Sequence, residues 1–371
     1  MRGKRKGRAV ADLSLSSANL VEVQGVSKHF PVRSGHFLRS GHEVVHAVDD
    51  VDLVIRRGET LGLVGETGCG KSTLARCITR LYDLTAGRVI FDGTDISSMT
   101  RRKMRPFRRR IQMIFQDPYG SLNPRRRVGS IIGDPFAIHD VADGDDRKAK
   151  VQELMRLVGL NPEHYNRFPA EFSGGQRQRI GVARALALQP DLIVADEPVS
   201  ALDVSIQAQV INLLADVQDQ YSLTYLFIAH DLSVVRHVSD RVAVMYLGKI
   251  VEIAPRDDLY ERPRHPYTSA LLSAVPTTDP DQADRRARVL LSGDVPSPIA
   301  PPSGCRFHPR CPKAKARCAI EEPLLTALAG DAPEHRFACH YPLADGEILE
   351  SGEPIVKTDQ ASRLAEMPDV P

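Results

Sequence analysis

The sequence lacks two features that would assign it to a broad class of protein. No apolar run among its 371 residues approaches the roughly 18 residues needed to cross a bilayer, so we expect no membrane span. Neither sign of charge dominates, because 49 Lys and Arg face 47 Asp and Glu, for a net charge of +2. The overall field therefore gives no support for nucleic-acid binding. What remains is a chain long enough for two or three packed globular domains.

An export signal is missing as well. Residues 1–8 are basic, like the start of a signal peptide, but residues 9–20 contain Asp12 and several serines and form no apolar segment. We therefore expect residues 1–19 to be a basic, flexible tail on a chain that is not exported. In a chain that stays inside the cell, the six cysteines are expected to be thiols or metal ligands rather than disulfides.

Short apolar runs alternate with helical patterns over residues 20–260, which predicts an α/β fold around a buried sheet. Strands are expected at 20–26, 51–55, 60–64, 89–91, 111–115, 192–195, 224–229 and 242–246. Helices are expected at 71–81, 173–188, 205–220 and 232–238, with a helical insertion over about 117–190. After about residue 260 prolines crowd the sequence, which predicts a loop-rich extension over 261–345 and a disordered tail at 346–371.

The strand expected at 60–64 leads directly into a glycine-rich loop, Gly65-Glu66-Thr67-Gly68-Cys69-Gly70-Lys71-Ser72. Two glycines spaced by four residues and followed by Lys and Ser form the phosphate-loop pattern. Backbone N–H groups and the N-terminus of the following helix would converge on phosphate oxygens. Lys71 would then reach the β- and γ-phosphates of ATP, and Ser72 would bind Mg²⁺.

A second apolar strand, at 192–195, ends in the carboxylates Asp196 and Glu197. Because side chains alternate along a strand, the two carboxylates cannot perform the same task. Asp196 suits the Mg²⁺ shell, and Glu197 can polarise the water that attacks the γ-phosphate.

Ser173-Gly174-Gly175-Gln176 is typical of a capped helix N-terminus and forms a second anion-binding site. One nucleotide does not need two such sites in one subunit. We therefore expect this one to serve the γ-phosphate bound by another subunit, which makes dimerisation part of the mechanism.

In this order, these segments resemble the ATP-binding subunits of ABC transporters. The resemblance implies an α/β P-loop ABC-type nucleotide-binding domain at 20–260, with its helical subdomain at about 117–190. It also implies the ABC roles of further residues. Thr73 completes the phosphate loop, Gln116 (Q-loop) senses Mg²⁺ and the nucleophilic water, Ser200-Ala201-Leu202-Asp203 forms the D-loop, and His230 contacts the γ-phosphate. Phe30 lies where the family places an aromatic on adenine, although it equally suits a core position.

Residues 111–124, 196–211 and His265-Pro266-Tyr267-Thr268 resemble the ATPase subunits of oligopeptide and dipeptide importers. This likeness implies a second, often non-identical ATPase subunit, two permeases and an extracytoplasmic binding protein, with this chain peripheral on the cytoplasmic face of the membrane. Nickel importers and a phosphonate-utilisation ATPase share the branch, so the solute stays open. A soluble ABC ATPase acting on nucleic acid or ribosomes normally has two cassettes or a long coiled coil, and neither is visible. A phosphotransferase has no use for Ser173 to Gln176.

Four of the six cysteines lie in the extension, at Cys305, Cys311, Cys318 and Cys339, with five, six and twenty residues between them. Four thiolates suit the four irons of a cubane cluster and equally a tetrahedral zinc, and unliganded thiols in a small core are a third possibility. A metal would also stabilise a loop-rich unit. The importers that this chain resembles can carry a [4Fe–4S] cluster here, which favours iron–sulfur. Under the zinc alternative, His308, His335 and His340 are substitute ligands.

Overall fold

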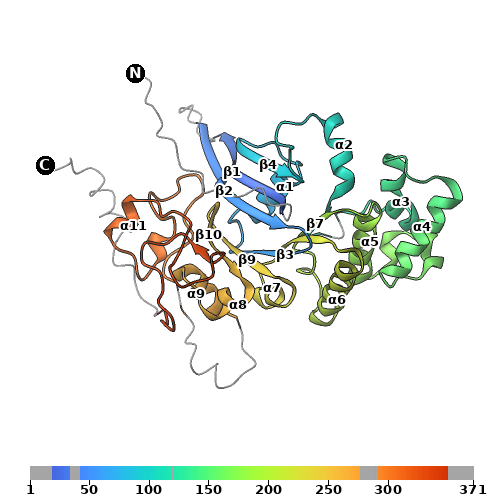
Figure 1. The fold of residues 1–371 in the computed structure, drawn as a ribbon. Coiled ribbons are helices and arrows are strands. Elements are labelled where there is room, and N and C mark those ends of the chain that lie inside the picture. The colour runs from blue at the N-terminus through green and yellow to red at the C-terminus, as the bar shows by residue number, and fades with distance from the viewer. Residues whose placement is uncertain (1–18, 34–41, 118–119, 276–288, 290, 350–371) are drawn as a thin grey trace.

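The computed structural model describes residues 19–33, 42–117, 120–275, 289 and 291–349 (Figure 1). The tail predicted at 1–19 lies outside this range except for its last residue, and the tail predicted at 346–371 lies outside it from residue 350 onward. No helix within the described ranges combines the length and apolarity required to cross a membrane.

An eight-stranded sheet forms the centre of the molecule, in the order β11-β12-β10-β9-β3-β8-β7-β6. Its parallel part consists of β9 (Arg241–Tyr246), β3 (Thr60–Val64), β8 (Thr224–Ile228), β7 (Leu192–Asp196) and β6 (Ile111–Ile114). Every residue of β3, β7, β8 and β9 is buried, as the continuous apolar runs predict for a parallel sheet covered on both faces. Because these strands are parallel, the loops after their carboxyl ends meet at one edge, which is where α/β folds bind ligands.

A second, antiparallel sheet has the order β2-β1-β4-β5. Its strands are β1 (Asn19–Arg33), β2 (His42–Arg56), β4 (Ala86–Phe91) and β5 (Thr94–Asp95). The helix that follows the phosphate loop, α1 (Lys71–Ile78), contacts β1 and β2 of this sheet and β7 and β8 of the central one. One apolar cluster therefore joins both sheets and includes α1 residues Leu74, Ala75, Cys77 and Ile78.

The helical subdomain contains α3 (Val128–Ile138), α4 (Gly144–Leu157) and α5 (Gly174–Leu186), with short 3-10 turns at Pro162–Asn166 and Pro169–Glu171. In Figure 1 it lies at the opposite side of the molecule from the extension. The other helices that precede the extension are α2 (Arg101–Arg110), α6 (Val204–Tyr221), α7 (Leu232–Val238) and α8 (Arg256–Glu261). The expectation of helix over 117–190 is wrong for residues 120–127, which form turns and irregular backbone.

The extension contains α9 (Pro266–Ser273), a 3-10 turn at His308–Arg310, α11 (Ala316–Ile320), β11 (Thr326–Ala327) and β12 (Arg336–Phe337). It is not a separate unit. Strand β12 pairs with β10 (Lys249–Pro255), a strand that the sequence analysis missed, and so adds the extension to the central sheet. A composition change alone does not reveal this pairing, because two-residue strands carry no periodic pattern.

A buried carboxylate fixes the extension in place. Glu252 of β10 is 0% exposed and accepts hydrogen bonds from the backbone N–H groups of Arg264 (2.7 Å) and His265 (2.9 Å) and bonds Nε2 of His335 (2.7 Å). A buried charge is tolerated only when it is paired and hydrogen-bonded, and this one meets that condition. His335, named above as a substitute zinc ligand, is therefore engaged elsewhere.

The prediction of disorder is wrong for residues 346–349, the part of the predicted tail that the structure describes. Leu349 is 3% exposed and belongs to a small apolar cluster with Ala270, Val289 and Leu343. The polar composition of 346–371 hid this single apolar anchor.

Candidate functional site

The phosphate loop follows β3, and two of its glycines are required by close backbone approaches. Gly65 has φ +152°, and a Cβ there would lie 2.1 Å from the Met245 carbonyl oxygen. Gly70 has φ +109°, and a Cβ there would lie 2.1 Å from the Ala47 carbonyl oxygen. Both contacts are far below van der Waals distance, so neither position accepts another residue without a shift of the backbone.

Lys71 opens helix α1 with a buried side chain that bonds back to its own loop. Its Nζ donates to the carbonyl oxygens of Gly65 (2.7 Å) and Glu66 (3.1 Å). The ammonium group therefore sits inside the curve of the loop, close to where phosphate oxygens would lie in a phosphate-loop protein. Cys69 lies beside it, with Sγ 3.8 Å from Nζ, and burial raises the pKa of the Cys69 thiol.

Asp196 ends β7 opposite the phosphate loop. Its Oδ1 accepts a hydrogen bond from Ser72 Oγ at 2.8 Å, so the two predicted Mg²⁺ ligands are adjacent. Desolvation raises the pKa of the Asp196 carboxyl, an effect that the Ser72 hydrogen bond opposes. A carboxylate and a hydroxyl are oxygen ligands of the type Mg²⁺ prefers, and an ion held there would supply positive charge to stabilise the phosphates.

Glu197 follows with a left-handed backbone, φ +47°, that is uncommon outside glycine and asparagine. Its N–H donates to the Ile228 carbonyl oxygen at 2.9 Å, which fixes the turn to the neighbouring strand. Gln116 Nε2 donates to Glu197 Oε2 at 2.8 Å, and His230 Nδ1 lies 3.5 Å from the same oxygen. Three residues that follow three different strands thus meet at one carboxylate, as the parallel sheet requires.

These three side chains line an open cleft of about 460 Å³, together with Thr67, Asp117, Ser200 and Ala201. Ser173 to Gln176 are not among the residues that line it. They begin α5, where Ser173 Oγ accepts from the Gln176 N–H (3.3 Å) and Gln176 Oε1 accepts from the Ser173 N–H (3.0 Å). This capping box leaves an exposed serine at a positive helix end. The capped helix end therefore contributes no residue to the lining of this cleft in its own chain.

Three other predicted nucleotide contacts lie as follows. Phe30 is half-buried on β1, and its ring packs edge-on against Tyr82 at 5.6 Å. Thr73 lies in α1, and the exposed Asp203 precedes α6. The capped helix end at Ser173–Gln176 lies beside α6, the helix that follows the D-loop, because a Cβ on Gly175 would lie 2.4 Å from Ile206 Cγ2 of α6.

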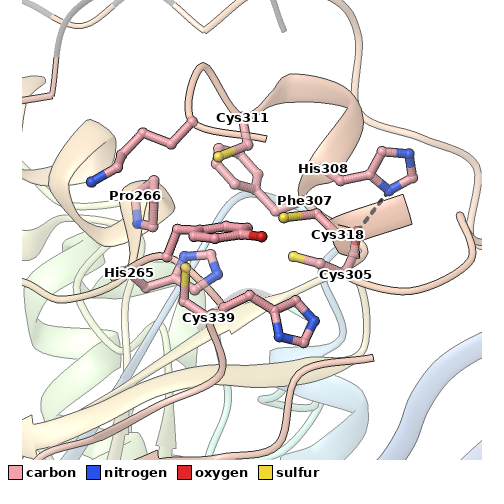
Figure 2. Close-up of a pocket in the computed structure, with 11 residues that line it drawn as sticks. His265, Pro266, Cys305, Phe307, His308, Cys311, Cys318 and Cys339 are labelled. Carbon is pink, nitrogen blue, oxygen red and sulfur yellow. Dashed lines mark hydrogen bonds between the residues drawn. The ribbon is translucent and has the colours of Figure 1, made fainter. Parts of the chain in front are cut away.

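The four cysteines of the extension line one pocket, shown in Figure 2, although up to twenty residues separate successive cysteines in sequence. Phe307, His265, His308 and His340 line it as well. Burial raises the pKa of Cys305 to about 11 and that of Cys339 to about 12, and it also raises the pKa of Cys311. Without a bound cation these thiols stay protonated at neutral pH, since the thiolate is the form that burial disfavours.

The sequence analysis missed the contacts between the extension and the phosphate loop. Arg310 pairs with the Glu66 side chain, and the Tyr267 hydroxyl accepts from the Glu66 N–H at 2.9 Å. In the sequence, His265-Pro266-Tyr267 indicates only a resemblance to a family. Its spatial relation to a loop about 200 residues earlier is not encoded in any local pattern.

A further His–carboxylate cluster lies on the antiparallel sheet. Ligand atoms of His29, His46 and Asp49 all lie within 4.8 Å of one another. Asp49 already pairs with Arg306 and lies 3.9 Å from Lys249. These two cations neutralise the carboxylate, so the cluster is an ion-pair network.

The combination of a phosphate loop, the Glu197 cleft beside it and a capped helix end that does not line this cleft indicates the class of protein: an ABC-type ATPase. Comparison with known proteins agrees. A family model described as ABC transporter matches residues 48–200, and one described as oligopeptide/dipeptide transporter, C-terminal region, matches residues 251–318.

Curated relatives match over nearly their whole length. An oligopeptide transport ATP-binding protein of Bacillus subtilis, AppF, is 55% identical over 322 residues, covering 86% of this chain and 97% of the relative. A di/tripeptide transport ATP-binding protein of Pseudomonas aeruginosa, DppF, is 48% identical and covers 87% and 97%. Among solved structures, the ATP-binding cassette MJ0796, a dimer in a post-hydrolysis state with ADP and Pi, superposes with a TM-score of 0.57 at 27% identity, covering 64% of this chain and 99% of that one.

The chain therefore belongs to the ABC transporter family, as an ATPase subunit that carries the oligopeptide/dipeptide C-terminal region. Membership implies ATP and Mg²⁺ at the site described above.

Proposed function

We propose that this chain hydrolyses ATP at an interface shared by two ATPase subunits and thereby drives uptake of oligopeptides or dipeptides. The observation that carries the proposal is that the capped helix at Ser173 contributes no residue to the Glu197 cleft of its own chain. A second subunit would supply that helix end to the γ-phosphate. Closure of the dimer would then depend on ATP, and hydrolysis of the ATP would allow the dimer to open.

Across the phosphate loop and the adjoining cleft, each side chain has a distinct task. Lys71 neutralises the β- and γ-phosphates, and Ser72 with Asp196 holds the Mg²⁺. Glu197 accepts a hydrogen bond from the attacking water and polarises it. Gln116 and His230, both beside Glu197 Oε2, orient the water and the phosphate. The Gln116 contact also provides a route by which the loop after β6 responds to the state of Glu197.

The peptide substrate rests on the relatives, whose names specify oligopeptide or di/tripeptide transport. By the same argument we infer two permease subunits, a paralogous second ATPase subunit and an extracytoplasmic solute-binding protein as partners, with this chain at the cytoplasmic face of the membrane and no nucleic acid involved. Nickel or another small solute remains the alternative cargo.

Uptake of labelled di- and oligopeptides tests the substrate, in cells that carry either the wild-type chain or Glu197→Gln as their sole copy. We expect peptide uptake to fall to background in the variant cells while nickel uptake, measured in parallel, is unchanged. Loss of nickel entry alone would keep the mechanism and overturn the peptide assignment. Unchanged uptake of both would contradict a transport role.

We further propose that Cys305, Cys311, Cys318 and Cys339 bind a [4Fe–4S] cluster. Their convergence on one pocket supports a metal site. The distances between their sulfur atoms favour a cluster over a single zinc ion. Four thiolates on one zinc at about 2.3 Å lie roughly 3.8 Å apart. Among the described residues, no three of these sulfurs lie within 4.8 Å of one another. A cubane holds each thiolate on a different iron and so accepts a wider set.

Anaerobically purified protein is expected to contain about four irons per chain and to show the broad visible absorption of an iron–sulfur cluster. Replacing any one of the four cysteines with Ser should reduce the iron content severely, whereas Cys77→Ser, at a buried position in α1, should leave it unchanged. About one zinc per chain in place of iron would select the alternative. Protein that lacks both metals would refute the site.

A further inference from the structure

Two side chains of the extension hold the phosphate loop from outside the cassette. Arg310 Nη1 and Nη2 lie 2.8 and 3.2 Å from the two carboxylate oxygens of Glu66. The Tyr267 hydroxyl accepts a hydrogen bond from the Glu66 backbone N–H at 2.9 Å. A bidentate Arg–carboxylate pair fixes direction as well as distance, so both the side chain and the backbone of Glu66 are held in place.

Glu66 is also the residue through which Lys71 is held. The carbonyl oxygens of Gly65 and Glu66 accept hydrogen bonds from Lys71 Nζ. A displacement of Glu66 would therefore move two of the acceptors that hold the ammonium group beside the phosphates. Arg310 thus acts on the nucleotide site through Glu66.

Aromatic packing holds Arg310 and Tyr267 in place. Tyr267 is 0% exposed, and its ring packs 4.7 Å from Tyr246 and 5.3 Å from Phe307. Arg310 lies in the 3-10 turn that directly follows Phe307, and its guanidinium stacks 5.9 Å from the Tyr246 ring. Phe307 itself lines the cysteine pocket, as Figure 2 shows, so the pocket, the aromatic cluster and the phosphate loop form one packed unit.

We propose that Arg310 is a positioning residue for ATP binding, which makes the nucleotide site of this chain incomplete without its extension. The proposal rests on the ATPase function inferred above and adds a contact that the cassette alone does not contain. Its physical basis is preorganisation. A loop held in its binding conformation loses less freedom when the triphosphate arrives, so ATP affinity increases while the chemical step stays the same.

The test measures ATP affinity by equilibrium titration, together with KM and kcat, for the full-length chain. Arg310→Gln removes the charge and the bidentate contact, and we expect about a tenfold rise in the dissociation constant and in KM, with kcat changed less than twofold. Arg310→Lys should recover part of the affinity. Arg317→Gln is the matched control, because the exposed Arg317 makes a comparable bidentate pair with Glu321, a residue of the extension and not of the phosphate loop.

A double-mutant cycle separates positioning from a general loss of stability. If Arg310 acts through Glu66, then Glu66→Gln should weaken ATP binding to a similar extent, and the double variant should be no weaker than either single one. Wild-type affinity in Arg310→Gln, or independent multiplicative effects in the double variant, would overturn the proposal. Failure of the wild-type chain itself to bind ATP would instead contradict the function proposed above.

Discussion

Replacing Glu197 with Gln should lower steady ATP hydrolysis by about 100- to 1,000-fold while leaving ATP binding intact. The amide preserves the shape of the side chain and its proximity to Gln116 and His230, but it cannot accept the proton of the attacking water. ATP would then remain bound and hold two subunits together. Phosphate release and size-exclusion chromatography with light scattering, each with and without Mg-ATP, measure the two effects.

The control for this experiment is Glu153→Gln, which makes the same chemical change at an exposed position of α4. It should hydrolyse ATP at the wild-type rate and show no ATP-trapped dimer. Hydrolysis at the wild-type rate by Glu197→Gln would refute the assignment of Glu197 as the residue that polarises water.

The opposite state is expected from Ser173→Arg, which should bind ATP as a monomer and fail to close. The substitution removes the cap on α5, which costs about 1 kcal/mol of stability. It also places a long side chain at the exposed helix end that the γ-phosphate of the partner would approach. We expect hydrolysis to fall at least 100-fold, with the dissociation constant for ATP on the isolated subunit changed less than threefold.

Ser173→Thr provides the matched control, because its hydroxyl retains the hydrogen bond to the Gln176 N–H without the added length. Thermal unfolding of both variants separates loss of the cap from loss of closure. An ATP-dependent dimer in Ser173→Arg, observed in the Glu197→Gln background where closure is most stable, would count against the shared site.

The central sheet was predictable because its parallel strands are short and predominantly apolar. The strand expected at 60–64 is β3, and those expected at 192–195 and 224–229 differ from β7 and β8 by one residue. Elements without such runs were missed or mistaken. Helix α2 is almost entirely basic and buries only Met104, and the pairing of β10 with β12 depends on two-residue segments. Local pattern carries no signal where only tertiary contacts stabilise the element.

Local sequence patterns were sufficient to predict the segments that form the nucleotide site. The phosphate loop, Asp196 with Glu197, and the Ser173 helix cap are each contiguous segments, and a parallel sheet necessarily brings the ends of its strands to one edge. How the extension contacts these segments became clear only from the tertiary structure. Residues that are distant in sequence meet in three places: the pocket of four cysteines, the hydrogen bonds of the buried Glu252, and the ion pair between Arg310 and Glu66. Side-chain pairing across such separations depends on the packed fold, because it leaves no periodicity or spacing in the chain.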